Sequence, residues 1–140
     1  MKILCIHGPN LNMLGKRSKT HYGELTLDQI YESLIDTFEE VEFTFYQSNH
    51  EGEILDLIHA SIDEDYDGLL INPGALCHQS IALRDALEIL TIPKVEVHLS
   101  NINEREDFRK INYIKDVCQA CFMGKKIESY HEAVQFFLHK

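Results

Sequence analysis

Side chains that could bind or transform a small molecule gather after the short apolar runs of this sequence. Four of its eight histidines stand at or just past the ends of such runs, beside asparagine, serine and glycine. Turns favour Gly, Pro, Asn, Asp and Ser for backbone reasons, whereas histidine has no comparable role there. The pattern therefore favours a ligand site over plain turn chemistry. The four histidines are His7, His50, His78 and His98.

Glu96 and His98 are two residues apart in a run that is typical of a strand. Side chains with this spacing share one face of a strand. The carboxylate can therefore fix the tautomer of the imidazole or hold its proton. Such a pair is suited to proton transfer.

The residues after His98 predict a helix whose N-terminus could hold an anion. Ser100 or Asn101 can cap it, with Glu104 completing a capping box if Asn101 is the cap. Free backbone N–H groups at that end would bind a carboxylate. Arg109 is open to two interpretations, a ligand clamp or a surface partner of Glu106.

The amino-terminal segment is a positive island in an acidic chain. The whole sequence has 13 basic and 23 acidic residues and a formal net charge of −10, yet residues 1–23 contain no Asp or Glu. The glycine-bounded stretch 15–23 could form a mobile loop that folds over a small anion. On charge alone, a solvated surface loop is the simpler interpretation. The cations of the island are Lys2, Lys16, Arg17 and Lys19, and Tyr22 lies near its end.

Composition excludes several classes of protein. With 44% hydrophobic and 26% charged residues, the chain is globular and not disordered. Its negative charge disfavours nucleic acids and anionic membrane surfaces as partners. No run approaches the roughly 20 apolar residues of a membrane span, and Gly8-Pro9 comes too early for a signal peptide. We expect a cytoplasmic protein.

The four cysteines, Cys5, Cys77, Cys118 and Cys121, are expected to be free thiols, because their surroundings are apolar or mixed. Cys118 and Cys121 have the spacing of a redox motif, but residues 117–123 are typical of a strand, which would point them to opposite faces. The HxxH and HExxH patterns are absent, as are the glycine-rich nucleotide loops. We expect no metal, although strand-end histidines leave a metal site as an alternative.

Apolar runs alternate with amphipathic stretches along the whole chain. This pattern predicts βαβ units, a parallel sheet and helices on both of its faces. We therefore predict one α/β domain over 1–140, a flavodoxin-like three-layer sandwich with a five-stranded parallel sheet of order 2-1-3-4-5. The expected strands are 2–7, 41–47, 68–72, 92–98 and 117–123, and the expected helices are 26–39, capped by Thr26, 51–63, 80–90, 101–110 and 129–138. Ligands of such sheets bind beyond the carboxyl ends of the strands.

Taken in order, these strand ends resemble the type II 3-dehydroquinate dehydratase family over nearly the whole chain. The matching stretches are GPNLNMLG at 8–15, Arg17 with YG at 22–23, QSNHEGE at 47–53, INPGA at 71–75 with His78, ALRDA at 82–86, VEVHLSN at 95–101 and REDFR at 105–109.

The resemblance implies dehydration of 3-dehydroquinate to 3-dehydroshikimate on the route to aromatic amino acids, without metal or organic cofactor. Removing a proton next to a ketone needs a base and a stabilised enolate, and loss of the hydroxyl needs an acid. By family analogy Tyr22 is the base as tyrosinate, with Arg17 as the required cation. Asn10 would stabilise the enolate through a water, and His98, oriented by Glu96, would protonate the departing hydroxyl.

Substrate binding and assembly follow from the same resemblance. The substrate carboxylate would rest on the backbone N–H groups of Leu99 and Ser100, and Asn72, His78 and Arg109 would hold its hydroxyls. The family commonly forms homododecamers, tetramers of trimers, in which the residue at the position of Asp85 reaches into a neighbour's site.

The chain departs from the family pattern in two places. The stretch after Arg17 lacks the usual proline, which predicts a more flexible lid. The usual Ser-Tyr pair is Asn112-Tyr113 here, and the carboxyl-terminal strand and turn are not glycine-rich. Two other classes remain as alternatives: a module that binds a small anion without transforming it, and a metal-dependent hydrolase that uses the strand-end histidines.

Overall fold

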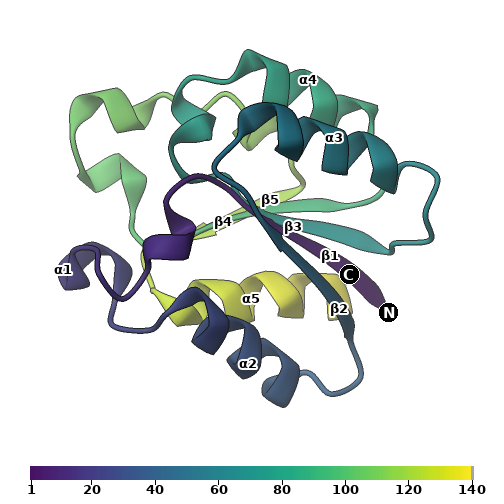
Figure 1. Cartoon of the computed structure of the whole chain (residues 1–140), viewed down its shortest axis with the longest axis horizontal. Helices are drawn as coiled ribbons and strands as arrows, with labels where there is room; N and C mark the ends of the chain where they lie inside the picture. The colour runs from purple at the N-terminus through teal and green to yellow at the C-terminus, as the bar shows by residue number, and fades with distance from the viewer. Residues whose placement is uncertain (140) are drawn as a thin grey trace.

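A five-stranded parallel sheet forms the centre of the computed structural model, which describes residues 1–139 (Figure 1). Its strand order is β2-β1-β3-β4-β5, so the predicted order and the flavodoxin-like α/β fold are confirmed. All neighbouring strands are parallel, which brings their carboxyl ends to one edge. The strands are β1 (Lys2–His7), β2 (Glu42–Gln47), β3 (Gly68–Asn72), β4 (Lys94–His98) and β5 (Ala120–Met123).

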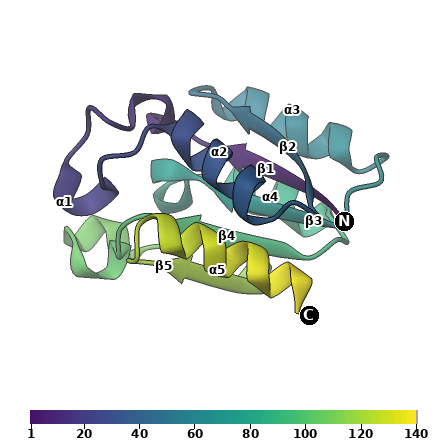
Figure 2. The same cartoon turned by 90° about the horizontal axis from the view of Figure 1, so that it is seen from below.

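Helices cover both faces of the sheet. α2 (Leu27–Thr37) and α5 (Ile127–Leu138) lie on one face, and α3 (Glu51–Ser61) and α4 (Ile81–Ile89) lie on the other (Figures 1 and 2). The two layers of core follow from the period-two alternation of strand side chains. In β1, Ile3 and Cys5 pack towards α2 and α5, whereas Leu4 and Ile6 pack towards α3 and α4.

The first long helix begins where the sequence predicts. The Thr26 side chain accepts a hydrogen bond from the Gln29 backbone N–H, and the Gln29 side chain accepts one from the Thr26 N–H, so a capping box is formed. This start anchors the segment before it, which contains the short helix α1 (Lys19–Tyr22). The predicted mobile loop of residues 15–23 therefore contains one helical turn.

The helix predicted over 101–110 is wrong. The segment forms two short 3-10 helices, η3 (Ile102–Glu104) and η4 (Asp107–Lys110), separated by the extended Arg105. Ile102 is buried but Phe108 is 59% exposed, so a continuous helix would have no apolar stripe to bury. Asn101 still caps through its side chain, which accepts from the Asn103 N–H, but Glu104 completes no box with it among the described contacts.

The last predicted strand is shorter than expected. β5 begins at Ala120, so Cys118 lies before it and the argument that Cys118 and Cys121 occupy opposite faces of one strand does not apply. Three further 3-10 helices connect the elements: η1 (Leu11–Met13), η2 (Gly74–His78) and η5 (Lys115–Val117). Across residues 1–139, the helices are all too short or too polar to cross a bilayer.

Candidate active site

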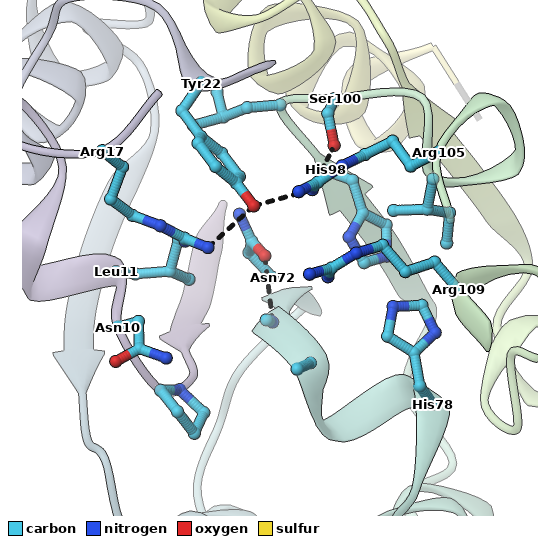
Figure 3. A pocket seen from close by; sticks show the side chains of 15 residues that line it. Asn10, Leu11, Arg17, Tyr22, Asn72, His78, His98, Ser100, Arg105 and Arg109 are labelled. Atoms are coloured by element: carbon cyan, nitrogen blue, oxygen red, sulfur yellow. Dashed lines mark hydrogen bonds between the residues drawn. The ribbon is translucent and has the colours of Figure 1, made fainter. Parts of the chain in front are cut away.

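The carboxyl ends of β1, β3 and β4 open onto a cavity of about 100 Å³ that is partly open to solvent (Figure 3). The stretch 15–23 approaches it from one side and the segment after β4 from the other. Ten of its lining residues are labelled in Figure 3: Asn10, Leu11, Arg17, Tyr22, Asn72, His78, His98, Ser100, Arg105 and Arg109. Of the four strand-end histidines, the structure thus brings His78 and His98 to the cavity, whereas His7 and His50 are not among its lining residues.

Two guanidinium groups converge on the phenol of Tyr22. Arg17 Nη2 and Arg105 Nη1 each donate to the Tyr22 oxygen at 2.7 Å. The Arg17 guanidinium also stacks on the Tyr22 ring, 3.7 Å from its centroid. Partial burial lowers the pKa of Arg17, an effect that the Tyr22 oxygen opposes. Two charge-assisted hydrogen bonds thus fix the Tyr22 oxygen at the cavity.

Glu96 and His98 form a buried pair at the end of β4. Glu96 is 0% exposed, and its Oε2 lies 2.5 Å from His98 Nε2. The same oxygen accepts a hydrogen bond from Asn112 Nδ2 at 2.8 Å. Because Nε2 faces Glu96, the other ring nitrogen, Nδ1, is the one left to exchange a proton with a ligand. The structure thus places the Glu96 carboxylate against the His98 ring, on the strand face that the two residues share.

Asn72 and His78 line the cavity, and both side chains are also hydrogen-bonded to other parts of the protein. Asn72 Nδ2 donates to the Tyr130 hydroxyl at 2.9 Å, and its Oδ1 accepts from the Gly74 N–H at 3.2 Å. His78 Nδ1 lies 2.7 Å from the Ile111 carbonyl, so it must carry the proton and leave Nε2 as an acceptor. Burial lowers the pKa of His78, which favours this neutral form.

The remaining predicted residues fall into two groups. Asn10, Leu99, Ser100 and Arg109 all line the cavity, and Arg109 is held by a hydrogen bond from its Nε to Glu106 at 2.9 Å. Arg109 therefore fits both interpretations, because it pairs with Glu106 and also lines the cavity. Asp85 does not line the cavity and lies exposed on α4.

Comparison with known proteins places this geometry in a family. A family model described as dehydroquinase class II matches residues 1–138. The chain belongs to the class II dehydroquinase family. A 3-dehydroquinate dehydratase from Thermotoga petrophila is 47% identical over 142 residues, covering 100% of this chain and 96% of the relative. One from Helicobacter pylori is 51% identical over 129 residues, covering 89% and 77%.

Solved class II dehydroquinases have the same architecture. The type II dehydroquinase of Butyrivibrio crossotus matches with a TM-score of 0.95 and 42% identity, covering 99% of this chain and 97% of that one. The enzyme of Propionibacterium acnes matches with a TM-score of 0.94 and 33% identity over the same shares. The shortened β5 and the proline-free lid are thus accommodated within the class II fold.

Two residues of this class II site were given no role by the sequence analysis. Arg105 contacts both Tyr22 and Ser100, whose Oγ accepts from Nη1 at 3.3 Å. Asn112 holds Glu96. Arg105 belongs to the REDFR stretch that matches the family. Its position shortly after the strand of the Glu96–His98 pair could have indicated that it reaches the site. Asn112 stood out only as a departure from the family's Ser-Tyr pair, and its contact with Glu96 depends on the path of the chain after η4.

Proposed function

We propose that residues 1–140, as a single catalytic domain, dehydrate 3-dehydroquinate to 3-dehydroshikimate through an enolate, without metal or organic cofactor. One observation carries this proposal. A tyrosine oxygen held by two guanidinium groups lines the same cavity as a histidine paired with a buried glutamate. An elimination next to a ketone needs this combination, a base for the C–H proton and an acid for the departing hydroxyl.

Tyr22 is the base. Its phenolate, neutralised by Arg17 and Arg105, takes the proton from the carbon next to the ketone, and the electron pair of that C–H bond forms the enolate. Asn10, at the mouth of the cavity, stabilises the enolate oxygen through a water molecule. The backbone of Asn10 supports this role, because its φ of 71° directs the chain into η1 beside the cavity.

His98 is the acid. When the enolate collapses to the conjugated ketone, the C–O bond breaks and the oxygen takes a proton from His98 Nδ1, so that water leaves. Glu96 stabilises the imidazolium that supplies this proton, through the 2.5 Å contact at Nε2. Proton exchange with solvent then returns Tyr22 and His98 to their starting states.

The polar wall of the cavity positions the substrate. Asn72, His78 and Arg109 hold its hydroxyl groups, and the backbone N–H groups of Leu99 and Ser100 hold its carboxylate. His78 offers an acceptor at Nε2, since its Nδ1 is bound to Ile111. Donors and an acceptor on one wall match a ring that carries several hydroxyl groups.

The enzyme acts as a cytoplasmic homododecamer, a tetramer of trimers, with Asp85 completing the site of a neighbour. The exposed surface of α4 supports such an assembly. Besides Asp85 it carries Ile81 and Ile89, whose exposed fractions are 57% and 55%. Large apolar side chains on one exposed helix face favour burial against a partner.

Purified protein should convert 3-dehydroquinate into an enone that absorbs in the ultraviolet, with undiminished rate in the presence of a chelator. Tyr22→Phe and His98→Ala should each lower the rate by about 10²–10⁴-fold, the usual contribution of a general base or acid, while circular dichroism remains that of the wild type. Lys2→Met, at the amino end of β1 and far from the cavity, is the matched control.

The assay also separates the alternatives. Thermal stabilisation by 3-dehydroquinate without product would indicate an anion-binding module. Activity lost on chelation would indicate a metal-dependent hydrolase. Full turnover in both variants would refute the assigned base and acid.

A further inference from the structure

A cysteine lies behind the Glu96–His98 pair. The Cys77 Sγ, a carboxylate oxygen of Glu96 and a ring nitrogen of His98 all lie within 4.8 Å of one another, and all three residues are buried. Among residues 1–139, this is the one group of three such donors that approaches metal-binding distances. The proposed reaction uses Glu96 and His98 but has no role for the thiol.

The Glu96 carboxylate provides a second, independent observation. Its Oε2 contacts both His98 and Asn112, whereas its buried Oε1 finds no nitrogen or oxygen donor among the described residues, which leaves the weak donor of a neighbouring thiol, Cys121, as its source of a hydrogen bond. A buried carboxylate oxygen without a partner is unfavourable, because it has lost water and gained nothing in return. The side chain is 0% exposed, so bulk solvent does not satisfy it.

A second thiol lies beside the same carboxylate. Burial raises the pKa of Cys121, and the charge of Glu96 and a hydrogen bond from the thiol to this carboxylate raise it further. The pKa of Cys77 is raised by burial and then by Glu96 in the same way. The surroundings of Glu96 thus combine soft sulfur with nitrogen and oxygen donors.

We propose that Cys77, Glu96 and His98 form a binding site for a thiophilic divalent cation of the Zn²⁺ class, and that its occupation inhibits the enzyme. Thiolate, imidazole and carboxylate are the three ligand types that Zn²⁺ accepts together. The binding part of this proposal stands on the donor geometry, and the inhibitory part rests on the proposed dehydratase function.

The geometry requires small adjustments. With metal–ligand bonds of about 2.0–2.3 Å, tetrahedral donor atoms lie roughly 3.3–3.8 Å apart. Donors within 4.8 Å of one another must therefore close by no more than about 1.5 Å, and the 2.5 Å contact between His98 and Glu96 must open to admit the ion. A water from the cavity can take the fourth position.

Inhibition follows from the protons involved. On binding, the Cys77 thiol releases its proton to solvent, and the cation replaces the proton between His98 Nε2 and Glu96. The imidazole then holds a single proton, on Nδ1. Donating that proton would leave an imidazolate, so the metal-bound ring is a far weaker acid than imidazolium.

Co²⁺ is a suitable probe, because its visible bands report coordination number and a near-ultraviolet band reports a thiolate ligand. Metal-free protein titrated with Co²⁺ should show a thiolate band with one ion per chain, and Zn²⁺ should displace it. In parallel, Zn²⁺ should lower turnover of 3-dehydroquinate, and a chelator should restore it. Cys77→Ser should abolish the band and raise the Zn²⁺ concentration for half inhibition at least about tenfold, measured against the variant's own metal-free rate.

Cys5→Ala is the control, since Cys5 lies in β1 on the other face of the sheet and should leave the band unchanged. Absence of the band in the wild type, or its survival in Cys77→Ser, would overturn the site. Should Cys77→Ser fail to fold, a crystal of the wild type soaked in Zn²⁺ decides through the anomalous signal at Cys77. A metal-free protein without turnover would instead refute the dehydratase function, while the Co²⁺ band still tests the metal site.

Discussion

The two sides of the cavity are built in opposite ways. On the sheet side, every residue of β3 and β4 is buried, and Glu96 and His98 are only 0% and 5% exposed. On the lid side, residues 15–23 contain one helical turn, held by backbone bonds from Tyr22 to Ser18 and from Gly23 to Lys19. No residue of α1 is buried. His98, the proposed acid, therefore has a rigid support, and Tyr22, the proposed base, does not.

This difference indicates how the Tyr22 side chain is held in position. Segments with few buried contacts have low local stability, so backbone packing alone does not fix Tyr22. Its oxygen is fixed by Arg17 from the lid and by Arg105 from the segment after β4. Arg105 therefore joins the two sides of the cavity.

The first prediction concerns the rigid sheet side, where acidification should lower the stability of the protein through His7. This side chain is 0% exposed at the end of β1, and burial lowers its pKa to about 4. An unfolded histidine titrates near about 6.5. As pH falls, His7 therefore takes up a proton in the unfolded chain before it does so in the folded protein. The stability that the protein has above pH 6.5, roughly the unfolded pKa of His7, is lost as pH falls towards the folded pKa of about 4. Between about pH 7.5 and about pH 5 the loss should be about 2 kcal/mol.

Urea unfolding of the wild type and of His7→Phe at both pH values measures this loss. The phenyl ring can keep the stacking on Tyr130, whose ring is 5.7 Å from that of His7, but it does not titrate. Its stability should fall by about 2 kcal/mol less than that of the wild type on acidification. Equal losses in both proteins would show that His7 is protonated in the folded state as readily as in the unfolded chain.

The second prediction removes the link between the two sides. Arg105→Met keeps a long apolar stem but loses the charge-assisted bond to Tyr22, which is worth about 1.5–3 kcal/mol for a charged group. We expect kcat/KM for 3-dehydroquinate to fall by about 10- to 100-fold. Arg17→Met should produce a similar loss, because both guanidinium groups lie 2.7 Å from the same oxygen.

The double variant tests whether the two arginines act through one atom. If both stabilise the Tyr22 phenolate, the losses in the single variants should not add. Strict additivity would instead assign Arg105 to an independent contact such as the one with Ser100. The control is again Lys2→Met, which removes a cation paired with Asp65 at the opposite end of the sheet.

The sheet side was also the side that the sequence predicted best. Continuous apolar runs define β1, β3 and β4, and their carboxyl ends place Asn72, Glu96 and His98. Hydrophobic periodicity predicted the wrong structure where side-chain contacts determine the backbone conformation and no apolar stripe is buried. Arg105 adopts an extended conformation that interrupts the predicted helix, and its guanidinium contacts Tyr22, 83 residues away in sequence.

Tertiary contacts of this kind leave no local pattern. Asn112 is one case, since a single donor to Glu96 has neither spacing nor periodicity. The cluster of Cys77 with the Glu96–His98 pair is another, because its members come from η2 and β4, which only the folded sheet brings together. The resemblance supplied the roles of Tyr22 and Arg17, which charge alone would have assigned to a solvated loop.

The smallest effect is expected on the lid side, at Lys126. Its backbone has φ 53° and ψ −129°, a conformation that favours glycine and costs other residues about 1–3 kcal/mol. The residue packs next to the lid, since its Cδ lies 3.4 Å from where a Cβ on Gly23 would be. Lys126→Gly should therefore raise stability by about 1 kcal/mol, because the relieved strain exceeds the entropy cost of the added glycine.

Lys125→Gly, one residue earlier and without positive φ, should lower the stability. Thermal unfolding of the three proteins measures both changes. A destabilised Lys126→Gly would mean that its packing against the lid outweighs the strain, and the lid side would then be more firmly anchored than its exposure indicates.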